Sequence, residues 1–113
     1  MLYKYKAYVV KVYDGDTITV NINLGMNIVF RNQKIRLYGI DTPEVRGEDR
    51  ESGFKARDWV REQILDKDII IETIKDKEGK YGRLLGIIYT IDCPLYSINN
   101  QLVDRGLAEV NFY

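Results

Sequence analysis

The strongest constraint on the fold is residues 17–24, where polar and apolar residues alternate without a break in the order Thr-Ile-Thr-Val-Asn-Ile-Asn-Leu. Successive side chains of a β-strand point to opposite faces, so this period of two is typical of a strand with one buried face. We therefore predict a strand over residues 17–24 whose core-facing side chains are Ile18, Val20, Ile22 and Leu24.

The rest of the chain divides into further strands and two helical stretches. Strands are expected over residues 5–13, 28–40 (interrupted near Asn32-Gln33), 68–75 and 84–91, and turns over residues 25–27 and 77–80. A helical period over residues 51–65 predicts an apolar stripe made of Phe54, Ala56, Trp59, Val60 and Ile64. Ser97 can cap a second helix that runs through Arg105 and ends at Gly106, and residues 107–110 are expected to be extended.

This order of elements suits a small barrel. Three strands, a helix, two strands and a helix favour a mainly β, five-stranded barrel of the OB type with two to three helices. An open α+β sheet is the alternative. A chain of 113 residues is the size of one domain, so residues 1–113 are expected to form a single unit.

Composition excludes several kinds of catalytic site. The chain has no histidine and one cysteine, so it holds no Ser-His-Asp or Cys-His nucleophile, no ordinary zinc site and no internal disulfide. Its 17 basic and 17 acidic side chains balance, so an anionic partner would be held by local contacts and not by net charge. Catalysis would depend on carboxylates, lysine, tyrosine, arginine or an oxygen-bound metal.

Two acidic clusters end predicted strands. They read Asp-Gly-Asp-Thr at residues 14–17 and Asp-Thr-Pro-Glu at residues 41–44. Each cluster alone is typical of a turn, but the barrel would bring both to one rim. Carboxylates that converge there repel one another unless a cation neutralises them, and such oxygen ligands suit Ca²⁺, Mg²⁺ or Mn²⁺.

Two arginines could complete such a site. Arg36 lies five positions before Asp41 on the predicted third strand, and Arg83 follows a glycine in Lys-Tyr-Gly-Arg. Taken singly, each is more often an ordinary surface charge. A cation beside arginines would, however, favour a phosphate-containing substrate, since both bind phosphoryl oxygens.

Four motifs together resemble a known family. The strings VYDGDTITV, IRLYGIDTPE, KYGRLLGIIY and NNQLVDRGLAEV occur in the order and spacing of the staphylococcal nuclease (thermonuclease) family. The resemblance covers residues 8–113 and implies an SNase-like OB-fold. It also implies that the protein acts on nucleic acid. We expect a monomer.

The resemblance assigns roles to the metal ligands and catalytic groups. It implies that Asp16 and Asp41 bind Ca²⁺ directly, that Thr42 lends its backbone carbonyl, and that Asp14 reaches the ion through water. Glu44 would hold the attacking water, as general base or by position alone.

The same resemblance assigns the residues that hold the substrate. It implies that Arg36 and Arg83 clamp the phosphate and stabilise the transition state. The positions that would contact the nucleotide are Lys80, Tyr81, Phe112 and Tyr113.

The implied activity is a calcium-dependent endonuclease, or phosphodiesterase, that hydrolyses DNA and RNA. Water would attack phosphorus in line with the leaving 5′ oxygen and leave 3′-phosphate ends. The alternative is a catalytically silent SNase-like module that binds nucleic acid or protein. A plain single-strand binder is a third interpretation, suggested by the aromatic and basic residues of LYKYKAY near the start.

Location is only weakly constrained by the sequence. No apolar run approaches the ~20 residues of a membrane span, so no membrane partner is expected. Residues 1–12 lack the pattern of a signal peptide, so export would require a leader that was removed. Better-known members of the family continue into a further helix after the position of Tyr113, so we expect either a naturally short form or a truncated one.

Overall fold

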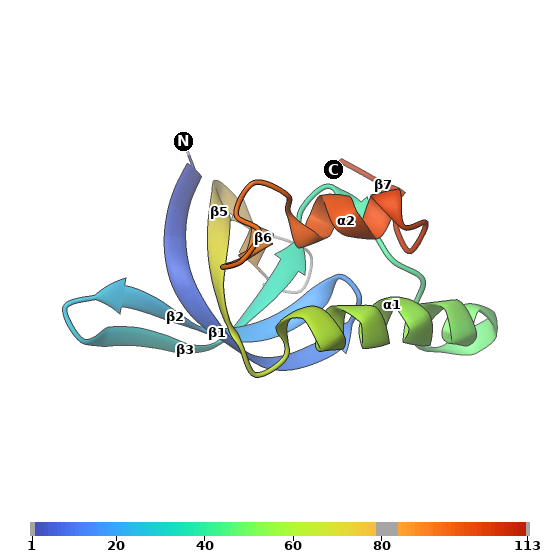
Figure 1. Cartoon of the computed structure of the whole chain (residues 1–113), viewed down its shortest axis with the longest axis horizontal. Coiled ribbons are helices and arrows are strands. Elements are labelled where there is room, and N and C mark those ends of the chain that lie inside the picture. The colour runs from blue at the N-terminus through green and yellow to red at the C-terminus, as the bar shows by residue number, and fades with distance from the viewer. Residues whose placement is uncertain (1, 79–83, 113) are drawn as a thin grey trace.

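A computed structural model describes residues 2–78 and 84–112, and within these ranges five strands close into a barrel (Figure 1). The barrel order is β1-β2-β3-β6-β5, and the two short strands β4 and β7 pair separately. The strands are β1 (Leu2–Asp14), β2 (Thr17–Gly25), β3 (Ile28–Leu37), β4 (Ile40–Asp41), β5 (Asp68–Glu78), β6 (Leu84–Thr90) and β7 (Glu109–Val110). The helices are η1 (Gly47–Asp49), α1 (Arg50–Ile64) and α2 (Ile98–Asp104). This architecture confirms the predicted five-stranded OB-type barrel.

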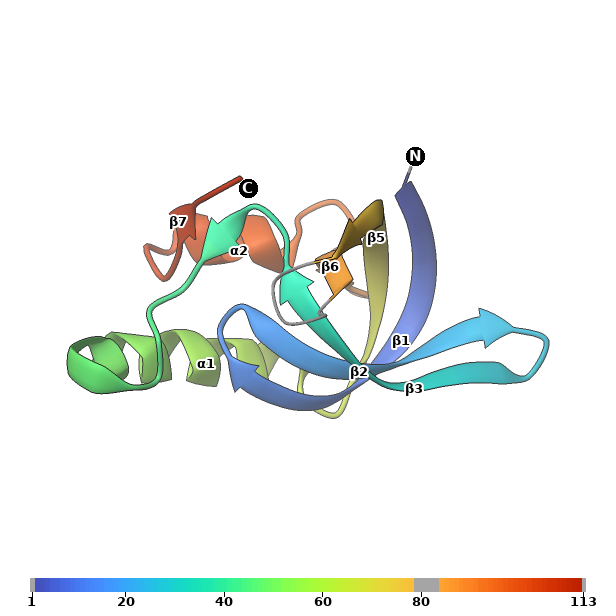
Figure 2. The same cartoon turned by 180° about the vertical axis from the view of Figure 1, so that it is seen from behind.

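The alternation in β2 places three of the four predicted side chains in the core. Ile18, Val20 and Ile22 are buried, but Leu24 is 46% exposed. The reason is that β2 and β3 continue past the barrel as a two-stranded hairpin, which projects from the body in both ribbon views (Figure 2). The prediction for Leu24 was wrong because alternation of polar and apolar residues indicates which face of the strand a residue occupies. It does not indicate whether another layer of the protein covers that face.

The predicted third strand is two strands in the structure. Tyr38 and Gly39 separate β3 from β4, and Gly39 has a φ of +81°, in the left-handed region that glycine adopts without strain. The irregularity expected near Asn32 is present, although β3 continues through it. Asn32 has a φ of +55°, and the pairing with β2 shifts register between Val20 and Ile22.

Helix α1 packs on the barrel through a narrower stripe than predicted. Its buried residues are Gly53, Ala56, Val60 and Ile64. Phe54 was assigned to this stripe and is instead 37% exposed, with the guanidinium of Arg57 stacked 4.5 Å from its ring centre. Trp59 is half-buried against the core. Gly53 replaces Phe54 at the contact because the chain between β4 and η1 passes too close to α1 for a larger side chain.

The C-terminal part of the described chain closes one side of the barrel. Ser97 caps α2 as predicted, since its hydroxyl oxygen accepts a hydrogen bond from Asn100 N at 3.0 Å. The stretch expected to be extended contains β7, which pairs antiparallel with β4. The predicted turn over residues 77–80 lies partly outside the described residues, and β5 continues to Glu78. In the described ranges, no helix has the length and apolar character needed to cross a bilayer.

Candidate functional site

The candidate site lies where the turn between β1 and β2 meets the end of β3. The carbonyl of Asp16 accepts a hydrogen bond from Leu37 N at 2.8 Å, which ties the first acidic cluster to the strand that carries Arg36. Gly15 permits this approach: a β-carbon there would lie 2.7 Å from Thr42 Cγ2 and 2.9 Å from Ala56 Cβ. The two acidic clusters and α1 therefore meet around a glycine.

Arg36 lies at the centre of the site. Its residue is 6% exposed, and its guanidinium forms ion pairs with the carboxylates of Asp16, at 3.2 Å, and Asp41. The same group donates to the carbonyls of Leu37, at 3.1 Å, and Ile40, at 2.9 Å. Planar guanidinium is suited to bridging acceptors in this way, and here it brings together acids that are 25 positions apart in the chain.

The Asp16 carboxylate is nearly buried and is fixed from several sides. The residue is 7% exposed, and besides Arg36 it accepts hydrogen bonds from Thr42 N at 3.0 Å and from Thr17 Oγ1 at 3.2 Å. These contacts hold its oxygens beside the Asp41-Thr42 segment. The predicted metal ligands Asp16, Asp41 and Thr42 are therefore neighbours in the fold.

Asp14 lies beside Asp16, as its predicted outer role requires. Its carboxylate accepts a hydrogen bond from Asp16 N at 3.1 Å. Burial, together with the neighbouring Asp16 carboxylate, raises the pKa of Asp14 to about 7. The site is thus crowded with negative charge.

A residue that sequence reasoning missed holds the other acid. The side-chain amide of Asn111 donates to Asp41, and its backbone N–H donates to Gly39 O at 2.8 Å. Asn111 comes directly after β7, which pairs with β4. This pairing places the side-chain amide of Asn111 beside the carboxylate of Asp41. Asn111 stands just beyond the last of the four recognised strings, and no pattern in the sequence marked it.

Glu44 occupies a different environment from the buried acids. The residue is exposed, and its backbone packs against α1 at Gly53. A β-carbon at Gly53 would collide with the carbonyl group of Glu44 and would lie 2.9 Å from Pro43 O. Gly53 is a second residue that sequence reasoning missed. Its only signal was a small residue inside an apolar stripe.

The remaining predicted residues are divided between described and undescribed parts of the chain. Phe112 is 66% exposed, and its ring meets that of Tyr38 edge-on at 5.4 Å between centroids. The predictions for Lys80, Tyr81, Arg83 and Tyr113 fall on residues outside those that the structure describes. Their assignments stay predictions.

The donor atoms of the site suit an oxygen-binding cation. Asp16 and Asp41 supply carboxylates, and Thr42 Oγ1 is a buried oxygen without a hydrogen-bond partner among the described residues. Hard divalent cations prefer such oxygens. In the described ranges, no three His, Cys, Asp or Glu side chains are grouped closely enough to hold a metal ion by themselves. Arg36 lies between two of the acids and neutralises them instead.

Comparison with known proteins finds a matching family and similar proteins. Residues 34–113 match the family described as staphylococcal nuclease homologue. Micrococcal nuclease of Shigella flexneri is 31% identical over 112 residues, which cover 92% of this chain and 57% of that protein.

Two uncharacterized proteins are also similar to this chain. One, from Methanocaldococcus jannaschii, is 31% identical over 128 residues, covering 94% of this chain and 59% of its own length. The other, from Bacillus anthracis, is 28% identical over 111 residues, covering 95% of this chain and 48% of its own. The chain thus spans about half to three fifths of the length of these relatives. By the match over residues 34–113, the chain belongs to the staphylococcal nuclease homologue family.

Proposed function

We propose that this protein is a calcium-dependent endonuclease that hydrolyses phosphodiester bonds in DNA and RNA. The observation that carries the proposal is the buried guanidinium of Arg36 between Asp16 and Asp41, in a chain of a nuclease family. A buried cation flanked by two carboxylates at the end of a barrel strand is an arrangement that can hold both a metal ion and a phosphate.

The cation would be held by the oxygens that already lie together. Asp16 and Asp41 would bind it directly with the Thr42 carbonyl, and Asp14 would act through water. The chemistry that a bound Ca²⁺ supplies is polarisation of a phosphoryl oxygen and neutralisation of its charge. Asn111, which donates to Asp41, would fix the orientation of that carboxylate.

The residues of the chain itself would bind the phosphate and activate water. Arg36 and Arg83 would bind phosphoryl oxygens and stabilise the charge that develops on them in the transition state. Phosphate binding at Arg36 competes with its present carboxylate and carbonyl acceptors. Glu44 is exposed and so is accessible to solvent, which suits a group that takes a proton from water or orients it.

Broad substrate range follows from the same chemistry. Contacts to phosphate position a nucleic acid without reading its bases, so a site built on arginines discriminates little between sequences or sugars. Phe112, exposed beside Tyr38, offers an aromatic face on which a base could stack. The expected products carry 3′-phosphate ends.

A second candidate is a catalytically silent module that binds nucleic acid or protein. The observation in its favour is that Arg36 already binds four protein acceptors, as in a purely structural ion-pair network. In that case the acids and Arg36 would stabilise the barrel rim and carry out no chemistry.

A degradation assay separates the two candidates. The chain is incubated with plasmid, heat-denatured DNA or RNA, in Ca²⁺ or in chelator, and the product ends are tested for 3′-phosphate by their need for phosphatase before extension. The enzyme cuts all three substrates in Ca²⁺ and none in chelator. A retarded but intact band under both conditions would identify the silent module.

A further inference from the structure

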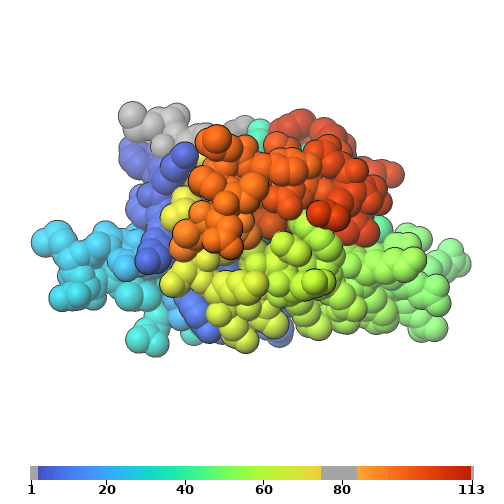
Figure 3. All heavy atoms as spheres, in the orientation of Figure 1, coloured from blue at the N-terminus to red at the C-terminus, as the bar shows by residue number. Residues whose placement is uncertain are grey.

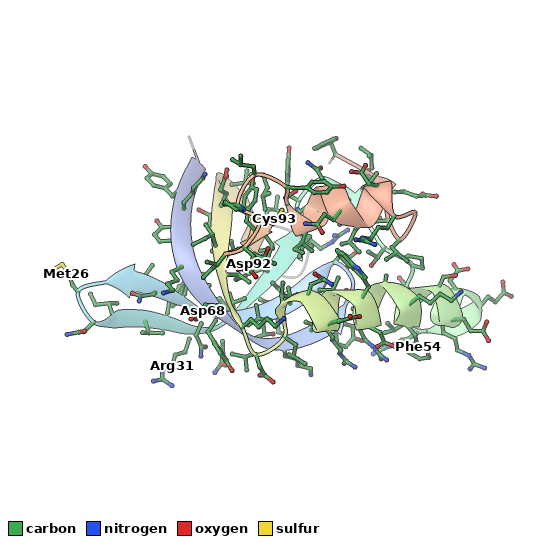
Figure 4. The ribbon with its side chains drawn as sticks, viewed as in Figure 1. Met26, Arg31, Phe54, Asp68, Asp92 and Cys93 are labelled. Atoms are coloured by element: carbon green, nitrogen blue, oxygen red, sulfur yellow. The ribbon has the colours of Figure 1, made fainter. Side chains whose placement is uncertain are left out.

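The end of the β2–β3 hairpin carries apolar side chains that the barrel does not cover. We call residues 24–30 the hairpin tip. It projects beyond the body in the ribbon and space-filling views (Figure 3), and Met26 lies at its extremity (Figure 4). The exposed apolar residues of the tip are Leu24 at 46%, Met26 at 93%, Ile28 at 54%, Val29 at 46% and Phe30 at 49%. Exposed apolar residues that are clustered, and not scattered singly, mark an interaction site.

The turn itself gives no structural reason for an apolar residue. Met26 and Asn27 have φ values of +54° and +62°, as a two-residue turn of this hairpin requires. Glycine, asparagine and aspartate adopt this conformation at lower cost than methionine. Met26 is therefore unfavourable both for its backbone conformation and for its exposure, and neither the core nor the turn explains it.

The hairpin is also basic. From residue 17 to residue 40 the chain contains no aspartate or glutamate, whereas Arg31 and Lys34 are exposed on β3. Arg31 points away from the body of the hairpin (Figure 4). At the hairpin base, a groove of about 270 Å³ is lined by Asp68 as well as Lys6 and Val29. The surface thus combines an apolar end with a cationic stem.

This combination favours one occupant over two others. In a second copy of the chain, antiparallel pairing of β3 with itself would set Arg31 and Lys34 against the same cations, which is destabilising. A nucleic acid would match the cations, and one base could stack on Phe30, but the aliphatic side chains of Leu24, Met26 and Ile28 would stay in water. A bilayer with anionic headgroups satisfies both parts: acyl chains bury the tip, and headgroups neutralise the stem.

We infer that the hairpin tip docks this protein on anionic lipid surfaces. Met26, Ile28 and Leu24 enter the headgroup region, and Arg31 and Lys34 face the lipid phosphates or carboxylates. This is contact with a surface and not a span, so it is compatible with the helices of the described residues, which are too short and too polar to cross a bilayer. The eight residue-to-residue steps along β2, from Thr17 to Gly25, place the tip about 27 Å from the acidic cluster. The inference is independent of the proposed nuclease activity.

Vesicle flotation with matched variants tests the inference. The full chain is floated with vesicles of phosphatidylcholine alone and with about 30% phosphatidylserine, at low salt. Met26→Asn with Ile28→Thr removes apolar surface while keeping residues that suit the turn and the strand. Leu95→Ser is the control, because Leu95 is 96% exposed outside the hairpin. Arg31→Gln with Lys34→Gln removes the stem charge, and Lys55→Gln on α1 is its control.

The expected result is flotation with anionic vesicles and much less with neutral ones. The tip variant should lower the partition coefficient by more than about tenfold and the stem variant by about 30-fold, with both controls unchanged. Equal binding by the tip variant and Leu95→Ser would overturn the inference. An absence of vesicle binding would also overturn the inference. In that case, tip-dependent dimers in sedimentation would identify a second copy as the partner, and tip-dependent retardation of an oligonucleotide would identify a nucleic acid. Circular dichroism of each variant confirms that the barrel is folded.

Discussion

The side-chain amide of Asn111 donates a hydrogen bond to the carboxylate of Asp41, 70 positions earlier in the chain. The other carboxylate oxygen of Asp41 binds Arg36, so the group is held from two directions. The antiparallel pair β4–β7 sets this contact, since Ile40 pairs with Val110 and Asp41 with Glu109. Asn111 thus reaches the candidate site because this short ladder forms.

Replacing Asn111 tests whether it positions Asp41. Asn111→Ala keeps the backbone hydrogen bond to Gly39 but removes the amide, so we expect calcium affinity to fall by about tenfold or more. The free energy of unfolding without metal should drop by only about 1 kcal/mol. Calorimetric titration with Ca²⁺ and urea unfolding measure the two effects. Asn100→Ala, at an exposed asparagine of α2, is the control; equal calcium affinity in both variants would contradict the role.

Removing Arg36 should affect both stability and activity. Arg36→Ala leaves the buried Asp16 carboxylate without its cation, which should lower the free energy of unfolding by about 3–5 kcal/mol in chelator. Ca²⁺ at a hundred times its Kd should restore about 2.7 kcal/mol, if the freed carboxylates bind it. Turnover should fall by about 10³ if Arg36 also clamps the phosphate.

Urea unfolding and a nuclease assay check the Arg36 prediction. Arg50→Ala, at an exposed arginine of α1, should change stability by no more than about 0.5 kcal/mol. An Arg36→Ala protein as stable as Arg50→Ala would show that the ion pairs are unimportant. One that calcium does not stabilise would argue against the metal site.

Glu44 should matter for turnover and not for folding. Its side chain is exposed, so Glu44→Gln should leave the melting temperature nearly unchanged while lowering kcat by about 10²–10⁴ if the carboxylate activates water. Glu48→Gln, at an exposed glutamate of η1, should keep full activity. Steady-state hydrolysis of denatured DNA compares the two, and equal rates would remove Glu44 from the mechanism.

Replacing Gly53 by alanine should lower the stability of the protein, although the same change inside a helix usually raises it. Glycine to alanine inside a helix usually raises stability by about 1 kcal/mol. At Gly53 the added carbon would collide with the carbonyl group of Glu44, so we expect a loss of about 1–3 kcal/mol and a fall in activity as Glu44 moves. Ser52→Ala, one position earlier and exposed, should be neutral or slightly stabilising. Thermal unfolding of both variants tests this prediction. A Gly53→Ala protein more stable than the wild type would mean that the loop at Glu44 can move away from α1 without cost.

Asn99 should be the most sensitive asparagine of α2. Its amide donates to Tyr38 O at 3.0 Å and Gly86 O at 3.1 Å, and its carbonyl accepts from Ile88 N at 3.0 Å. Asn99→Ala takes the side-chain acceptor from Ile88 N and the donor from Tyr38 O, whereas Gly86 O keeps its hydrogen bond from Tyr38 N. We expect a cost of about 1–3 kcal/mol. Asn100→Ala is the matched control on the same helix, and the midpoints of urea unfolding give the comparison.

Much of the fold was predictable because the pattern of apolar residues and capping residues along a segment indicates the secondary structure of that segment. The alternation of residues 17–24 identified a strand and its buried face, and Ser97 and Gly106 marked the ends of α2. The errors fell where a second element decides burial. Leu24 is exposed because the β2–β3 hairpin extends past the barrel. Gly53 takes the buried position expected for Phe54 because the chain near Glu44 passes over α1.

The sequence by itself determined which chemistry is available: acids, arginines and no histidine, in motifs that resemble one family. Which of these groups meet was decided only by the pairing of strands, in the barrel and in the separate β4–β7 sheet. Arg36 reaches Asp16 through the pairing of β2 with β3, and Asn111 reaches Asp41 through that of β4 with β7. A periodic pattern specifies the face of a strand but not its neighbour, because register and partner depend on hydrogen bonds between segments far apart in the chain.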